Sequence, residues 1–86
     1  QNNLINTSIK LPLMIKVDNE NFDLSSKFER TLAKIDLINN YSIISFNKDF
    51  IVYEVIFNGG PQNFLKIMKE KNFTFNTEKK IWILNE

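Results

Sequence analysis

The chain has 86 residues, of which 43% are hydrophobic and 24% are charged, and its eleven basic and ten acidic residues give a formal net charge of +1. This length supports one apolar core, and the low Gly and Pro content argues against a disordered or collagen-like chain. The sequence contains no His and no Cys, which excludes the common zinc sites, cysteine nucleophiles, a Ser-His-Asp triad and disulfides. The small net charge provides no long-range field that would draw the domain onto nucleic acid or acidic lipid.

The first eight residues are largely polar and begin with Gln1 rather than Met. We interpret residues 1–8 as an N-terminal extension or linker remnant of a longer protein, and residues 9–86 as a single domain. No apolar run reaches the roughly 18 residues that indicate a transmembrane helix, so we expect no membrane span. Asn, Ile, Lys and Phe are abundant while Arg30 is the only arginine, a bias typical of an AT-rich genome.

Residues 9–17 alternate between aliphatic and other side chains. Every odd position from Ile9 to Val17 is aliphatic, and this period of two predicts a strand with one buried face. Pro12 has no backbone N–H to donate, so we expect it near the start of the strand.

A helical period follows the polar stretch at residues 18–21. Apolar residues recur at spacings of four, four and three, which places them on one face of a helix; they are Leu24, Phe28, Leu32 and Ile35. Asp23 is a candidate cap for the first turn, and Ser26 with Glu29 has the spacing of a capping box one turn later.

Residues 41–57 contain two β-rich runs on either side of the polar turn Asn47-Lys48-Asp49, a pattern that predicts a hairpin. Both faces of the second run are apolar, as expected of a central strand. Gly59-Gly60-Pro61 then ends the strand and begins a helix with Pro61 at its first position, and we expect this helix to end near Lys71. The last element is a strand or a small terminal hairpin, because residues 73–75 and 81–84 flank a polar turn.

The resulting order β-α-β-β-α-β predicts an α+β fold of the ferredoxin-like, split βαβ kind. In that fold four antiparallel strands form one sheet, two helices cover one face, and right-handed crossovers place the first and third strands in the centre. We expect one core that contains Phe28, Leu32, Tyr53, Val55, Phe64 and Trp82.

The sheet face that the helices leave uncovered is the candidate interaction face, and its residues are Met14, Lys16, Phe50, Val52, Glu54 and Ile56. An exposed apolar patch of this kind marks a contact surface. We expect a second copy of the chain or the remainder of the parent protein to cover it. Lys16 and Glu54 are interpreted as a cross-strand ion pair, since no second group accompanies Glu54 to make a catalytic site.

Other motifs favour structural interpretations. Gly59-Gly60-Pro61 lacks the rest of a phosphate-binding loop and is read as a turn, and the lysines of the C-terminal third alternate with Glu as on a solvated surface. Residues 48–55 only partly match the strand signature of RNA-recognition domains, because Val52 stands where a stacking aromatic belongs. We predict no catalytic residue, no metal ligand and no cofactor.

Three runs carry a resemblance to a known family: Leu11-Pro12-Leu13-Met14-Ile15-Lys16-Val17, Tyr53-Glu54-Val55-Ile56-Phe57-Asn58-Gly59-Gly60-Pro61-Gln62-Asn63-Phe64-Leu65 and Ile81-Trp82-Ile83-Leu84. They resemble the C-terminal domain of a bacterial envelope-protein family of unknown function, whose members open on Leu-Pro-Leu/Ile, end a strand in Gly before a short helix, and finish on Trp-x-Leu. The matching residues are Gly59, Phe64, Leu65, Trp82 and Leu84, whereas Gly60-Pro61 departs from the pattern. The resemblance implies an exported, periplasmic or envelope module without enzymatic activity, and it carries over no catalytic residue.

These observations favour a non-enzymatic accessory or protein-interaction domain of a larger exported bacterial protein, acting through its sheet face or an edge strand. One alternative is an RNA-recognition-like nucleic-acid-binding domain, against which the small net charge of +1 argues. Another is a regulatory domain that binds a small molecule and dimerises through its sheet. The fold alone does not choose among them.

Overall fold

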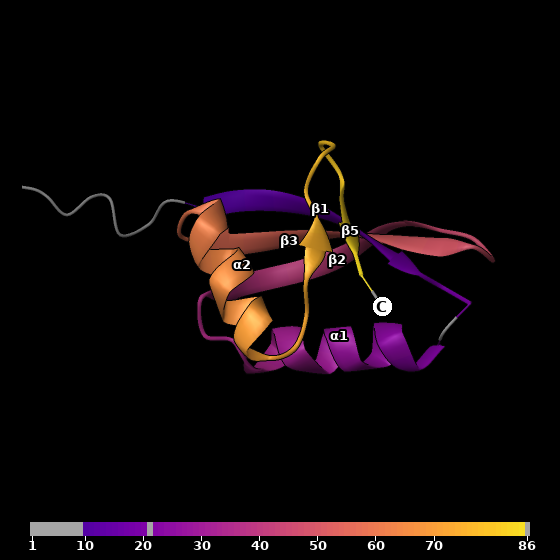
Figure 1. The fold of residues 1–86 in the computed structure, drawn as a ribbon, viewed down its shortest axis with the longest axis horizontal. Coiled ribbons are helices and arrows are strands. Elements are labelled where there is room, and N and C mark those ends of the chain that lie inside the picture. Colours follow the sequence, from indigo (N-terminus) through magenta and orange to yellow (C-terminus); the bar gives the residue numbers. More distant parts are fainter. Residues whose placement is uncertain (1–9, 21, 86) are drawn as a thin grey trace, which may run out of the picture.

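The computed structural model describes residues 10–20 and 22–85; the predicted N-terminal extension and Ile9 lie outside the described residues. The elements in chain order are β1 (Lys10–Asp18), α1 (Phe22–Lys34), β2 (Ile38–Phe46), β3 (Phe50–Asn58), α2 (Pro61–Glu70), β4 (Phe75–Asn76) and β5 (Trp82–Leu84). In Figure 1, α2 crosses in front of the strands and α1 runs along one side of them. None of the described helices is long and apolar enough to cross a membrane.

The five strands form one mixed sheet in the order β2-β3-β1-β5-β4. β1 pairs antiparallel with β3 along its whole length, from Lys10 opposite Asn58 to Asp18 opposite Phe50. β5 runs parallel to β1, with Trp82 beside Ile15, and β4 pairs antiparallel with β5. β1 and β3 are therefore interior strands, as predicted.

The predicted four-stranded antiparallel ferredoxin-like sheet is wrong, although the α+β class is confirmed. The difference arises after α2, where the chain makes the terminal hairpin that the sequence left open as an option. The returning strand β5 enters the sheet between β1 and β4 and runs parallel to β1.

The core lies between the sheet and both helices. The odd-numbered residues of β1 and β3 point inward, and Ile15, Val17, Tyr53, Val55 and Phe57 are completely buried. Helix α1 contributes Phe28 and Leu32, and α2 contributes Phe64 and Met68. The expected core is confirmed for five of its six members, whereas Trp82 is only half-buried and packs against the core from its margin.

Helix α1 begins at Phe22, two residues earlier than an N-cap at Asp23 requires. Asp23 therefore lies inside the first turn, where its charge still favours the positive end of the helix dipole. The predicted capping box is wrong, because Ser26 and Glu29 both lie within the helix and Glu29 accepts a hydrogen bond from the Tyr53 hydroxyl instead.

The junction into α2 has the predicted form. Gly59 adopts a φ of +147°, which strongly favours glycine, and a Cβ at this position would lie 3.0 Å from the Phe57 ring. Gly60 is the N-cap and Pro61 is the first helical residue. Gly59 and Pro61 therefore have structural roles at this junction, whereas Gly60 has an ordinary extended φ of −85° and open space where a Cβ would lie.

The end of α2 is a Schellman turn. The N–H of Phe73 donates to the carbonyl of Met68, and the N–H of Asn72 donates to the carbonyl of Lys69. Asn72 has a φ of +70°, a conformation that Asn tolerates better than most residues. This turn fixes the loop that leads to β4 and inserts Phe73 into the core beside Phe28.

Candidate functional site

The structure brings the six residues of the candidate interaction face together. In the register of β1 and β3, Met14 lies opposite Glu54 and Lys16 lies opposite Val52, with Phe50 and Ile56 on the same side. Because side chains alternate along a strand, all six occupy the face opposite the helices.

The burial of this face differs from the expectation of an exposed apolar patch. Val52 is only 8% exposed although it lies outside the main core cluster, and the other five residues are half-buried. A charged side chain at Val52 would therefore destabilise the fold more than one at an exposed position would. The cause is local, since Val52 is flanked on this face by Lys16 of β1 and by Ser45 of β2.

Lys16 makes a different contact from the predicted one. Its ammonium nitrogen lies 4.2 Å from the centre of the Phe50 ring, a cation–π distance. The strand register places Met14, not Lys16, directly opposite Glu54. The expected ion pair between Lys16 and Glu54 is therefore replaced by a contact between Lys16 and Phe50.

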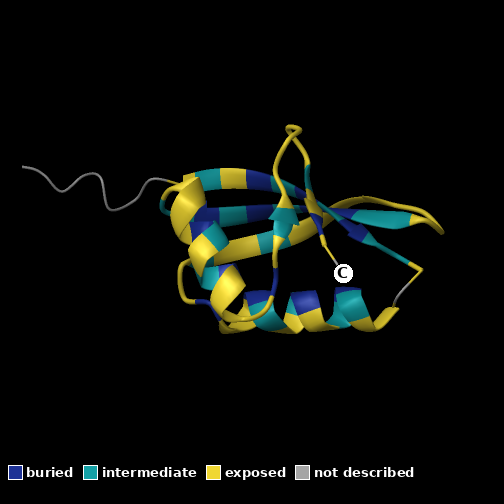
Figure 2. Cartoon of the chain, in the orientation of Figure 1, coloured by how far each residue is buried: buried dark blue, intermediate teal, exposed yellow. Residues whose placement is uncertain are grey.

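The edge strand β2 carries three of the seven large hydrophobic side chains that are exposed among the described residues. Ile43 and Ile44 are each 50% exposed and Phe46 is 72% exposed. Figure 2 shows β2 as exposed over most of its length, in contrast to its neighbour β3. Only β3 pairs with β2, so the other backbone edge of β2 is open among the described residues.

Sequence reasoning predicted the strand but not this surface. The signal was present as a run without charge, because residues 37–47 contain no Asp, Glu, Lys or Arg in a chain that is 24% charged. A second signal is the absence of proline from the same run. Natural edge strands commonly carry lysine or proline to prevent strand addition.

A shallow cavity of about 660 Å³ lies at one end of the candidate interaction face. Lys16 and Phe50 line it together with Asp18, Glu20 and Asp49. The carboxylate of Asp18 accepts a hydrogen bond of 2.8 Å from the backbone N–H of Glu20, which is ordinary turn chemistry. Within residues 10–20 and 22–85, no three His, Cys, Asp or Glu side chains are grouped so that they could hold a metal ion.

The most strongly perturbed titratable group is Tyr53, on the helix side of the sheet. Its hydroxyl donates a 2.6 Å hydrogen bond to Oε2 of Glu29. Burial is the largest cause that raises the pKa of Tyr53, followed by this hydrogen bond and the charge of Glu29. The pKa of Tyr41 is also raised, first by burial and second by the charge of Glu29. A completely buried tyrosine needs a partner for its hydroxyl, so the pair has a structural role.

No family model, curated protein or solved structure matches the chain.

Proposed function

We propose that this domain is a non-enzymatic protein-interaction module that assembles with a second copy of itself through the edge strand β2. Its exported, envelope setting within a larger bacterial protein is part of the proposal and is supported by the sequence resemblance alone. The observation that carries the proposal is the open edge of β2. This strand has no charged residue and carries the exposed side chains of Ile43, Ile44 and Phe46.

The backbone of β2 supplies the first reason for self-pairing. An edge strand presents unpaired N–H and C=O groups that a further strand can satisfy. Two register irregularities interrupt the pairing of β2 with β3, but residues 40–43 between them keep a regular register. This segment is the natural centre of a β2–β2 contact.

The absence of charge supplies the second reason. In a two-fold interface the same patch meets itself, so every charge on it would face a like charge nearby. β2 carries none, and two antiparallel copies would therefore meet without repulsion. The contact would also remove part of the Ile43 and Ile44 side chains from water, which is favourable.

The test is the oligomeric state of the purified domain as a function of concentration, measured by sedimentation or light scattering. We expect a reversible dimer that is lost in the double variant Ile43→Lys with Ile44→Lys, because four lysines would then crowd the two-fold axis. The matched control is Ile81→Lys with Ile83→Lys, which changes two isoleucines of comparable exposure away from β2 and should leave the dimer intact.

A wild-type domain that stays monomeric at all concentrations would contradict this proposal. So would a control variant that loses the dimer as readily as the β2 variant does. Circular dichroism of both variants checks that each one remains folded.

An RNA-recognition function is less well supported. Such domains stack bases on aromatic side chains of the two central strands. On the described part of β1 and β3, Phe50 is the one aromatic residue on the uncovered face, and the Lys16 ammonium lies over it.

A further inference from the structure

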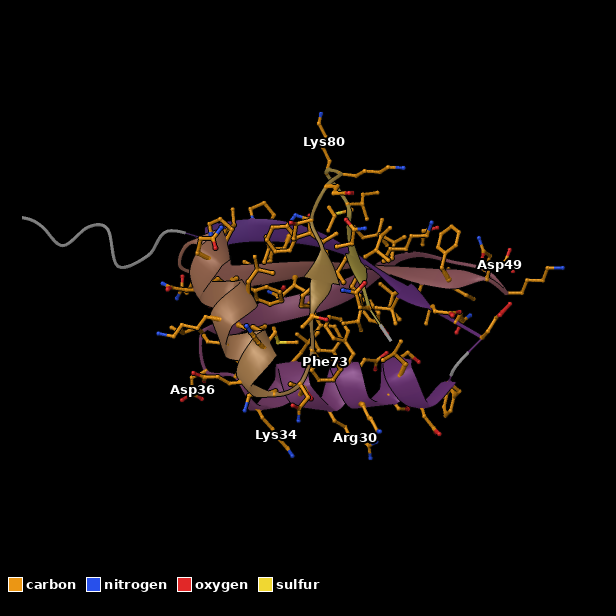
Figure 3. The ribbon with its side chains drawn as sticks, viewed as in Figure 1. Arg30, Lys34, Asp36, Asp49, Phe73 and Lys80 are labelled. Atoms are coloured by element: carbon orange, nitrogen blue, oxygen red, sulfur yellow. The ribbon has the colours of Figure 1, made fainter. Side chains whose placement is uncertain are left out.

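A groove on the helix side of the molecule gathers positive charge. It has a volume of about 490 Å³ and lies between α1 and the turn that follows α2. Its charged lining residues are Lys27, Arg30, Lys34 and Lys71. Arg30 and Lys34 project from α1 away from the sheet in Figure 3.

The charge of this groove is unbalanced. It contains four of the eleven basic residues of the chain, and no described Asp or Glu side chain lines it. The remaining seven basic residues are outnumbered by the ten acidic ones. A protein that is almost neutral as a whole therefore has a locally cationic concavity in its described part, which is the electrostatic requirement for an anion site.

Three of the four cations form a stripe along one helix. Lys27, Arg30 and Lys34 are separated by three and four residues, so they are neighbours on the surface of α1. Like charges at these spacings destabilise a helix, and a bound anion would remove the repulsion. Of the two carboxylates of α1, Asp23 precedes Lys27 by four residues and is its neighbour on the helix surface, whereas Glu29 accepts a hydrogen bond from the Tyr53 hydroxyl.

The opposite wall of the groove is fixed before any ligand binds. Lys71 and Asn72 belong to the Schellman turn, whose backbone bonds use the carbonyls of Met68 and Lys69. Phe73 anchors this turn in the core. Asn72, Asn85 and Thr31 add neutral hydrogen-bonding groups to the lining. Preorganised donors bind an anion without the cost of ordering a loop.

We propose that this groove binds a small molecule carrying two adjacent phosphate groups. The stripe from Lys27 to Lys34 extends about 10 Å along the helix axis, given a rise of 1.5 Å per residue, which exceeds the reach of one phosphate. The volume lies within the range typical of small-ligand sites. Lysine and arginine are the usual ligands of phosphate oxygens. The groove is on the helix side of the sheet, so the proposal goes beyond the β2 contact and does not depend on it.

A small ligand is favoured over a nucleic-acid chain. Nucleic-acid binding needs a cationic surface long enough to follow the phosphate backbone, together with aromatic platforms for the bases. The surface outside the groove is net acidic, and Phe73, the one aromatic residue in the lining, is buried in the core.

Calorimetric titration with pyrophosphate at constant ionic strength tests the proposal. We expect saturable binding to the wild-type domain that weakens at least about tenfold in the double variant Arg30→Gln with Lys34→Gln, because two charge-assisted hydrogen bonds are lost. The control variant Lys79→Gln with Lys80→Gln removes the same charge from the exposed turn between β4 and β5 and should bind within about twofold of wild type. The Arg30/Lys34 variant should melt no lower than wild type without ligand, since it relieves repulsion within α1.

Three results would overturn the proposal. The first is no saturable binding of pyrophosphate up to about 10 mM. The second is equal weakening in the two double variants, which would show that only net charge matters. The third is tighter binding of single-stranded RNA than of pyrophosphate with a steep dependence on salt, which would assign the groove to a nucleic acid instead.

Discussion

Tyr53 shows how one residue connects the sheet to α1. Its ring is completely buried and lies 5.3 Å from that of Phe28, centre to centre, while its hydroxyl reaches Glu29. The apolar part of the side chain thus fills the core and the polar tip is satisfied by a helix side chain. The sequence predicted the position of Tyr53 in the core, but nothing in the local pattern identified Glu29 as its partner.

Replacing Tyr53 by Phe should destabilise the domain by about 1–2 kcal/mol at pH 8, because the hydrogen bond to Glu29 is lost. The difference should shrink at high pH. The pKa of Tyr53 is raised in the folded state, so the stabilisation is fully present below the ordinary pKa near 10 and is lost as the pH rises above it. At pH 11 the stabilisation that this group contributes to the wild-type domain should be smaller than at pH 8.

Urea denaturation of the wild type and Tyr53→Phe at pH 8 and pH 11 measures this change directly. Other groups that titrate in this range are common to both proteins and cancel in the comparison. An unchanged difference at the two pH values would show that Tyr53 keeps an ordinary pKa in the fold.

The inward and outward faces of the two central strands were predictable residue by residue. The alternation in β1 and β3 correctly placed Val55 in the core and Val52 on the uncovered face. The burial of the Val52 side chain was not predictable. It depends on neighbouring side chains of β1 and β2, and only the strand register places them beside Val52.

Among the elements, the turn that ends α2 has the clearest local requirement. Asn72 occupies the left-handed region with a φ of +70°. Asn72→Ala should cost about 1 kcal/mol, and Asn72→Gly should be neutral or slightly stabilising, because glycine adopts this conformation without a Cβ penalty. Chemical denaturation measures both changes.

Lys71→Ala is the matched control for these variants. Lys71 is the adjacent C-cap residue with an ordinary φ of −101°, so its replacement should change the free energy of unfolding by less than about 0.5 kcal/mol. Equal stabilities for Asn72→Ala and Asn72→Gly would contradict the role assigned to the turn.

The positions of the helices and strands were largely predictable from the sequence, whereas the surfaces that they form together were not. The apolar spacing predicted α1, and Pro61 predicted the start of α2, as the structure confirms. The cationic stripe of Lys27, Arg30 and Lys34 has a recognisable helical spacing. The sequence does not show that this stripe and Lys71 line the same groove, because their proximity depends on how α1 packs against the turn after α2.

At the scale of the whole molecule, the sheet order was the part that sequence reasoning got wrong. β4 and β5 have two and three residues, too few for an alternation pattern to reveal which strand each one pairs with. The insertion of β5 beside β1 is set by long-range contacts such as that of Trp82 with Phe64. The same limit applies to β2, whose place at the sheet edge follows from topology and not from its own residues.

The open edge of β2 is the proposed pairing surface for a second copy of the chain. Amide hydrogen exchange at residues 40–43, followed as the protein is diluted, tests it most directly, because alternate amides of an edge strand point away from its neighbour. We predict that the outward-facing amides are protected in concentrated protein and lose that protection on dilution, in step with dissociation of the dimer. Fast exchange of these amides at every concentration would contradict the claim.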